Sequence, residues 1–170
     1  YLGVNEAVKA YEARKLNDGK LGVFWHTQGS GKSYSMVFLA QKIRRKFAGS
    51  PTIVVLTDRD ELNKQISDTF ENCGLLGKAN ASAFMASSGE DLIKKLQGNP
   101  SFVFTLIQKF NQPDPEPIYP DHDILIMSDE AHRSQYGLTE KVVVRQKEDG
   151  EVEAKTIIGT ARIIRDTLPN

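Results

Sequence analysis

The sequence predicts an α/β fold, with an open, mainly parallel sheet and helices on both faces. Three apolar runs of strand length carry this prediction, at residues 52–57, 102–107 and 123–128. None of them alternates polar with apolar residues, which is typical of strands that are covered on both faces. Segments with helical spacing of apolar residues lie between the runs, and strands that alternate with helices favour a parallel sheet.

The N-terminal third of the chain contains two predicted helices and one further strand. Residues 4–16 space their apolar side chains in the manner of a short helix. The run LGVFWH at 21–26 is apolar and of strand length, so a further buried strand is predicted there. Residues 32–47 again show helical spacing, and three cations in the last turn suit the negative end of a helix dipole.

Helices are also predicted on either side of the middle of the chain. Acidic residues follow the first apolar run and open a helix whose buried stripe includes Ile66 and Phe70. Ser88 and Asp91 have the spacing of a capping box, so another helix is predicted from about Gly89.

Two irregular features are predicted in the C-terminal third. Four prolines between 113 and 120 exclude a central strand and predict an exposed loop. Residues 141–158 form two strand-like stretches around Asp149-Gly150, the pattern of a β-hairpin. We therefore expect a hairpin inserted near the C-terminus.

Composition narrows the class of protein. The 170 residues suffice for one domain, and 39% apolar with 26% charged residues is typical of a soluble globular protein. Lys plus Arg and Asp plus Glu both total 22, so no overall basic field attracts nucleic acid. The single cysteine, Cys73, excludes an internal disulfide and suits the cytoplasm, and no run is long enough to cross a bilayer. A start at Tyr1 indicates a fragment of a longer chain.

The stretch HTQGSGKS, residues 26–33, has the ending of a phosphate-binding loop. Glycines let the backbone turn its N–H groups around a phosphate, and a following helix adds positive potential. Lys32 would reach the β- and γ-phosphates of a nucleotide, and the Ser33 hydroxyl would coordinate Mg²⁺. His26 stands where the usual G-x-x-x-x-G-K-[ST] pattern has its first glycine. The predicted ATP-binding residues are Thr27, Gln28, Gly29, Ser30, Gly31, Lys32 and Ser33.

A phosphate loop requires a carboxylate partner, and SDEAH at 128–132 supplies one. Asp129 falls at the carboxyl end of an apolar run, where open α/β sheets bind ligands. Its predicted role is to hold the Mg²⁺ shell, and Glu130 is a candidate general base for the attacking water. Lys32, Asp129 and Glu130 together predict hydrolysis of a nucleoside triphosphate.

These motifs, with several others, resemble a known family. SDEAH downstream of a Gly-x-Gly-Lys-Ser loop is similar to the first RecA-like domain of superfamily two helicases and translocases. The match is closer to the restriction (R) subunit of type I restriction-modification enzymes, in which His-Thr-Gln precedes the loop. The stretches that carry it are GVFWHTQGSGKSYSMVFLAQKI, IVVLTDRDELNKQI, FTLIQKF, SDEAHRSQYG and ARIIRDTLPN.

The resemblance implies roles that spacing alone does not. It implies a RecA-like P-loop NTPase fold, and it places Arg59, Thr105 and Lys109 on the phosphate backbone of duplex DNA. His132 and Arg133 would couple the nucleotide state to that DNA track. The partners implied are double-stranded DNA, the methyltransferase and specificity subunits, and a second RecA-like domain of the same parent chain.

The family pattern also defines what these 170 residues lack. A nuclease domain would precede them, and a second RecA-like domain that closes the ATP cleft would follow. We therefore expect a single N-terminal motor half, with little activity in isolation. The pairing of Pro113-Asp114 with Glu153-Ala154-Lys155 superficially matches a nuclease motif, and we interpret it as a chance match.

The favoured function is an ATP-dependent motor that moves duplex DNA before the parent enzyme cuts it. Another DEAH-type helicase or remodelling ATPase is the alternative within the same class. A small-molecule P-loop kinase and a non-catalytic interaction module are alternatives from other classes. The kinase is opposed by the acidic motif at a strand end and by the absence of a lid-like arginine cluster.

Overall fold

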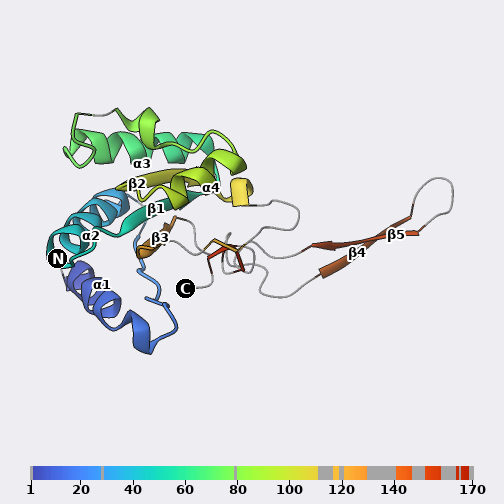
Figure 1. The fold of residues 1–170 in the computed structure, drawn as a ribbon, viewed down its shortest axis with the longest axis horizontal. Helices are drawn as coiled ribbons and strands as arrows, with labels where there is room; N and C mark the ends of the chain where they lie inside the picture. Colours follow the sequence, from blue (N-terminus) through green and yellow to red (C-terminus); the bar gives the residue numbers. More distant parts are fainter. Residues whose placement is uncertain are drawn as a thin grey trace.

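The centre of the computed structural model is a three-stranded parallel sheet in the order β2-β1-β3 (Figure 1). The strands are β1 Thr52–Thr57, β2 Phe102–Leu106 and β3 Ile124–Ser128. The structure describes residues 2–27, 29–78, 80–110, 117–118, 121–129, 164 and 166–168, and the backbone of 141–146 and 152–157. The three predicted apolar strands are confirmed within one residue of their expected ends.

β1 is the strand around which the sheet forms. All six of its residues are buried, and it pairs in parallel with β2 on one edge and β3 on the other. Its β-branched residues suit a pleated surface that is covered on both sides. Because the strands are parallel and in register, their carboxyl ends meet at one edge of the sheet.

Helices cover both faces of the sheet, as predicted. Alternate residues of β1 face opposite sides, so Ile53 and Val55 pack in one core cluster and Val54 and Leu56 in another. The first cluster takes in side chains of α1 (Leu2–Glu12), α2 (Lys32–Lys46) and α3 (Asp60–Asn72), and the second takes in Leu92 and Leu96 of α4 (Gly89–Gln97).

The α-helices agree closely with the predicted ones, whereas two of the short 3₁₀ helices (η2 and η3) were not predicted. They are α1 Leu2–Glu12, η1 Arg14–Leu16, α2 Lys32–Lys46, α3 Asp60–Asn72, η2 Ala81–Phe84, α4 Gly89–Gln97 and η3 Ile107–Phe110. α4 begins where the capping box predicts, with Ser88 Oγ accepting a hydrogen bond from Asp91 N.

The predicted strand at residues 21–26 is wrong. These residues form no strand, and Trp25 is 86% exposed. Gly22 has φ +113°, which breaks the extended path inside the run. Only Leu21 packs against the first core cluster, while Phe24 turns outward to contact Gly3 of α1. The phosphate loop is thus preceded by an irregular segment.

The C-terminal third confirms the hairpin and corrects the proline loop. β4 Lys141–Gln146 pairs antiparallel with β5 Val152–Ile157, and Figure 1 shows this hairpin extending away from the sheet. The expected turn at Asp149-Gly150 lies outside the described residues, as does most of the proline segment. Within that segment Ile118 is buried in the second core cluster, and its N–H donates to the Thr167 carbonyl at 2.7 Å, so the segment is not wholly exposed.

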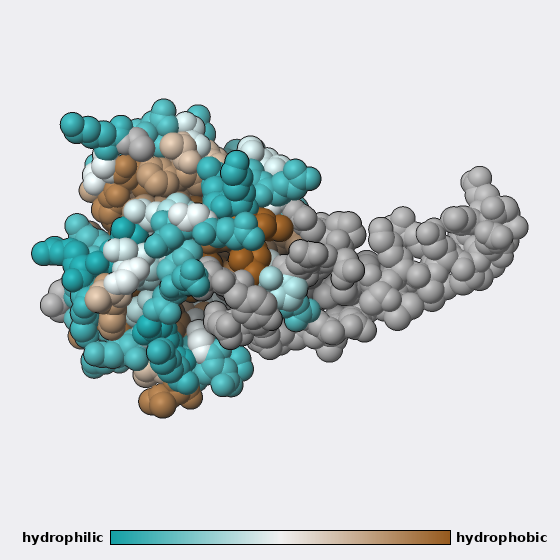
Figure 2. Space-filling view, in the orientation of Figure 1, coloured by the Kyte–Doolittle hydropathy of each residue, from teal (hydrophilic) through white to brown (hydrophobic). Residues whose placement is uncertain are grey.

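The surface of the described residues is mostly polar on the face that Figure 2 shows, with hydrophobic side chains in a strip beneath α3. Among the helices that the structure describes, none is both long and apolar enough to span a membrane.

Truncation of Phe70 should destabilise the fold strongly. Its ring is fully buried and meets the rings of Phe102 and Phe104 edge-on, at centroid distances of 5.5 and 5.3 Å. We expect Phe70→Ala to lower the free energy of unfolding by about 3–5 kcal/mol, and Phe70→Leu by clearly less, because a smaller cavity remains. Urea unfolding checks this, and equal losses in the two variants would contradict the packing described.

Candidate nucleotide-binding site

The loop before α2 has the backbone of a phosphate-binding turn. Gly29 and Gly31 have φ +75° and +83°, values that residues with a Cβ rarely adopt. Gly31 is the N-cap of α2 and carries no side chain that could cap the first-turn N–H groups. A helix N-terminus that ends in such a turn presents N–H donors and positive potential to an anion.

Lys32 and Asp129, far apart in the sequence, are brought together. Lys32 Nζ forms an ion pair with Asp129 Oδ1, and the Asp129 side chain is only 4% exposed. The Asp129 N–H donates to the Leu56 carbonyl at 2.8 Å, which continues the sheet hydrogen bonding past the end of β3. The predicted partnership of the loop lysine with the strand-end carboxylate is therefore present in the fold.

α2 is braced so that its N-terminus lies at the carboxyl edge of the sheet. At its other end, Arg44 Nη1 donates to the carbonyls of Pro51 and Ser101 at 3.1 and 3.2 Å, next to the start of β1 and β2. Burial lowers the pKa of this guanidinium from its usual value. Ala40 and Ile43 are completely buried against the sheet. The helix thus holds the loop at the edge where ligands bind in open α/β sheets.

The residues present suit a magnesium ion. Mg²⁺ prefers a carboxylate and hydroxyl or water oxygens and takes few ligands from the protein. The nearly buried Asp129 carboxylate already faces a cation, the Lys32 ammonium group, so its environment accommodates positive charge. Ser33 follows Lys32 in the first turn of α2 and supplies the hydroxyl.

The front of the loop contains contacts that the sequence prediction missed. Ser30 Oγ donates to the Thr27 carbonyl at 2.6 Å, and His26 Nδ1 lies 2.8 Å from the same hydroxyl. The mismatch of His26 to the usual pattern was the available signal, but only the folded loop shows what the imidazole contacts. Gln28 lies outside the described residues.

The three predicted DNA-contacting residues differ in accessibility. The Arg59 side chain is 57% exposed just beyond β1 and lies 3.6 Å from Asp58 Oδ2. Thr105 is completely buried within β2, and its hydroxyl is 3.4 Å from the Leu106 carbonyl. In this conformation the Thr105 side chain is therefore not accessible from the surface of the described residues.

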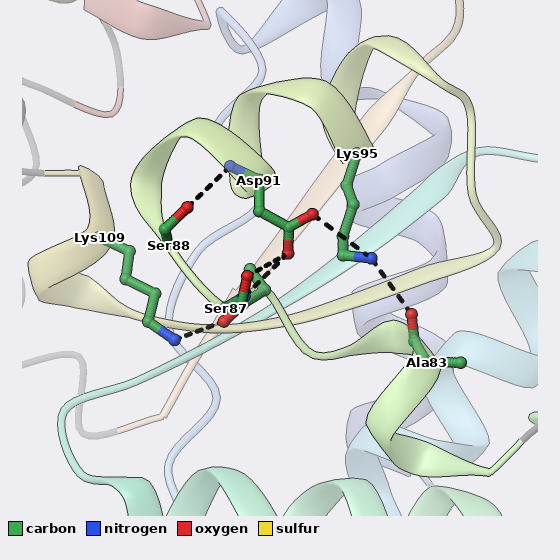
Figure 3. Close-up of polar contacts among 7 residues, drawn as sticks. Ala83, Ser87, Ser88, Asp91, Lys95 and Lys109 are labelled. Atoms are coloured by element: carbon green, nitrogen blue, oxygen red, sulfur yellow. Dashed lines mark hydrogen bonds and ion pairs between the residues drawn. The ribbon is translucent and has the colours of Figure 1, made fainter.

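Lys109 lies within a polar network at the start of α4 (Figure 3). Its Nζ donates to the Ala86 carbonyl. Next to Ala86, the N–H and hydroxyl of Ser87 donate to Asp91 Oδ2 at 2.8 and 3.1 Å. Lys95 Nζ lies 3.8 Å from Asp91 Oδ1 and donates to the Ala83 carbonyl at 3.2 Å. In this conformation Lys109 therefore holds the segment that leads into α4.

The remaining predicted residues, Glu130, His132 and Arg133, lie outside the described residues. Their roles stay predictions.

A glycine-rich turn at a helix N-terminus, with its lysine against a carboxylate at a strand end, defines the class of P-loop nucleoside triphosphatases. The sequence model described as SWI2/SNF2 ATPase matches residues 1–170, and the chain belongs to this family. The α/β fold agrees with a RecA-like domain of that family, and membership implies the use of ATP.

The chain is similar to endonuclease subunits of type I restriction enzymes. It is 39% identical over its whole length to the type I restriction enzyme HindI endonuclease subunit of Haemophilus influenzae. It is also 38% identical, over 71% of its length, to the putative type I restriction enzyme MjaIXP endonuclease subunit of Methanocaldococcus jannaschii. The matches cover 16% and 12% of those two relatives, so the chain spans a small part of their length.

Neutralising Asp91 should weaken the fold in a pH-dependent way. The Ser87 N–H is the main cause that holds the pKa of this carboxyl below its usual value; burial opposes it, and the Ser87 hydroxyl and Lys95 lower the pKa further. A lowered pKa means that the carboxylate stabilises the fold above its unfolded-state pKa and loses this effect as the pH falls through the folded-state pKa. We expect Asp91→Asn to lower the free energy of unfolding by up to about 1 kcal/mol at neutral pH.

The measurement is urea unfolding near pH 7 and again below about pH 3, where the difference from wild type should shrink. Glu90→Gln, which neutralises a carboxylate in the same turn, is the control. A difference that does not change with pH would contradict this role of Asp91.

Proposed function

We propose that this chain is the ATP-hydrolysing motor domain of a type I restriction enzyme R subunit, which moves duplex DNA before the parent enzyme cuts it. The pairing of Lys32 with Asp129 at the strand end carries the ATPase part of the proposal. The similarity to endonuclease subunits along the whole chain supports the restriction part.

Each residue of the candidate site has a defined task in this proposal. The turn at Gly29–Gly31 and the α2 N-terminus bind the phosphates, and Lys32 exchanges Asp129 for the β- and γ-phosphate oxygens. Ser33 and Asp129 hold Mg²⁺, which when bound neutralises phosphate charge. Glu130 accepts the proton of the attacking water as general base. The exchange keeps charge paired, because the cation that leaves Asp129 is replaced by another.

Contact with DNA falls mainly to Arg59 in this proposal. It is the exposed cation at the carboxyl end of β1, the edge at which the nucleotide site also lies. His132 and Arg133 follow the acidic motif and would couple the nucleotide state to the DNA track. The neutral chain requires such local contacts, since its overall charge does not attract DNA.

The rest of the assembly follows from the same proposal. A nuclease domain and a second RecA-like domain lie elsewhere in the parent polypeptide, of which this chain is the N-terminal motor half. Methyltransferase and specificity subunits are its partners, and the complex acts in the cytoplasm. The small share of the relatives' length that the chain spans supports the presence of further domains.

Another superfamily two DEAH-type DNA helicase or remodelling ATPase is the second candidate, because the matching family is described only as SWI2/SNF2 ATPase and this description names no restriction function. ATP-dependent cleavage of unmethylated DNA by the full-length protein with its partner subunits supports the restriction function. ATP-driven movement on DNA without any cleavage would support the alternative.

Loss of the Lys32 ammonium group should weaken the binding and hydrolysis of ATP. We expect Lys32→Ala to weaken the Kd for Mg-ATP at least about tenfold, since a charge-assisted contact to phosphate is lost. Hydrolysis should fall about a hundredfold or more. Calorimetric titration and phosphate release on the full-length protein test this. Lys20→Ala, in the turn ahead of the loop, is the control, and unchanged binding in Lys32→Ala would refute the site.

Substitutions of Arg59 and of Lys109 should have different effects on DNA binding. Arg59→Ala is expected to weaken DNA binding equally across sequences and to reduce the slope of log K against log salt by about one. Lys109→Ala is expected mainly to lower the free energy of unfolding by about 1 kcal/mol, because its amine supports Ala86. Fluorescence anisotropy at several salt concentrations provides the slopes. An unchanged slope in Arg59→Ala would exclude it as a phosphate contact.

A further inference from the structure

We infer that His26 is a positioning residue for the phosphate loop. Phe24, which packs on Gly3 of α1, holds the His26 ring in place. This inference rests on the proposed nucleotide site. It assigns a task to the residue that replaces the first glycine of the usual loop pattern, and it connects the loop to a helix outside the phosphate-binding turn.

The directions of the hydrogen bonds show which ring nitrogen of His26 acts as a donor to Ser30. The Ser30 hydroxyl has one proton, and it donates that proton to the Thr27 carbonyl at 2.6 Å. His26 Nδ1, 2.8 Å from the same oxygen, must therefore be the donor to Ser30. The Ser30 N–H also donates to the Thr27 carbonyl, at 3.2 Å. Two bonds thus close the turn from Thr27 to Ser30, and His26 orients the hydroxyl that makes one of them.

The ring of His26 is held from its other side. Phe24 meets it edge-on at a centroid distance of 4.6 Å and an interplanar angle of 65°. Nε2 is buried and has no hydrogen-bond partner among the residues that the structure describes. Turning the ring by 180° about its Cβ–Cγ bond would put Cδ2 in the place of Nδ1, so the hydrogen bond to Ser30 holds the ring in its present orientation.

Phe24 in turn depends on a glycine in α1. A Cβ atom at Gly3 would lie 1.8 and 2.3 Å from Cε2 and Cζ of the Phe24 ring, so any larger residue would displace the ring. α1 itself is fixed to α2, since Lys42 Nζ donates to Asn5 Oδ1 and Lys46 lies 2.9 Å from Glu12 Oε2. Contacts therefore run without a gap from α1 through Phe24 and His26 to Ser30.

The benefit for nucleotide binding is a loop that is ordered in advance. Glycines lose more conformational freedom on ordering than other residues, and this turn contains Gly29 and Gly31. A loop that is already held in one shape leaves less of that cost to be met when the phosphates bind. His26 supplies this restraint, because its ring is fixed by Phe24 while its Nδ1–H fixes Ser30.

The test compares two substitutions of His26 in the full-length protein. His26→Ala removes the donor and the ring, and we expect the Kd for Mg-ATP to rise about tenfold, the factor for one such hydrogen bond. His26→Asn keeps an N–H donor attached at Cγ, where Nδ1 is attached in histidine, and should stay within about threefold of wild type. Calorimetric titration measures both. An unchanged Kd in His26→Ala, or equal weakening in His26→Asn, would overturn the inference.

A second test acts from α1. Alanine is a better helix former than glycine, so Gly3→Ala should not weaken α1 itself. It should nevertheless raise the Kd for Mg-ATP severalfold, because Phe24 is displaced from His26. In Phe24→Ala the ring is already missing, so adding Gly3→Ala should cause no further loss. Fully additive effects would refute the pathway through Phe24.

Two controls separate this inference from the proposed function. Gly98→Ala, whose Cβ would make only ordinary contacts of 3.5 Å, should leave the Kd unchanged. Lys32→Ala should weaken Mg-ATP binding at least about tenfold, whichever residue stands at position 26. If Lys32→Ala binds Mg-ATP like wild type, the proposed nucleotide site is wrong. If it loses binding while His26→Ala does not, only the positioning role is wrong.

Discussion

The structure depends on the complete burial of β1. A buried strand cannot leave its N–H and C=O groups unpaired, so β1 must have a neighbour on each edge and a cover on each face. Parallel pairing to β2 and β3 meets the first demand, and the helices of the two core clusters meet the second. Since all three strands run in the same direction, their polar carboxyl ends lie at one edge of the sheet, and the candidate nucleotide site lies there.

The ion pair between Lys32 and Asp129 is a consequence of that arrangement. Asp129 is nearly buried because it continues the hydrogen bonding of the sheet, and a buried carboxylate is stable only when its charge is compensated. The loop lysine provides the compensation, and Arg44 at the far end of α2 fixes the helix that delivers it. The same demand for a cation suits the carboxylate to binding a metal ion.

How closely the sequence predicted each helix or strand depends on whether local or long-range interactions stabilise it. β1 and α4 were predicted closely because their signals are local, namely a run of β-branched residues and a capping box. The strand prediction at 21–26 was wrong because an apolar run does not by itself provide a neighbouring strand to pair with. In addition, Gly22 bends the chain within the run. Thr105 and Lys109 look equivalent to Arg59 in the sequence, but the fold buries the first and engages the second with Ala86.

The failed strand prediction and the atypical His26 have one explanation. In an ordinary phosphate loop, a strand paired in the sheet fixes the entry to the turn, and small residues suffice within it. Here the segment before the turn makes no strand, so side chains must fix the entry. Phe24 packs on α1 at Gly3 and contacts the His26 ring, and His26 forms a hydrogen bond with Ser30 in the loop. The imidazole at this position thus makes contacts with Phe24 and with Ser30, and glycine could make neither of them.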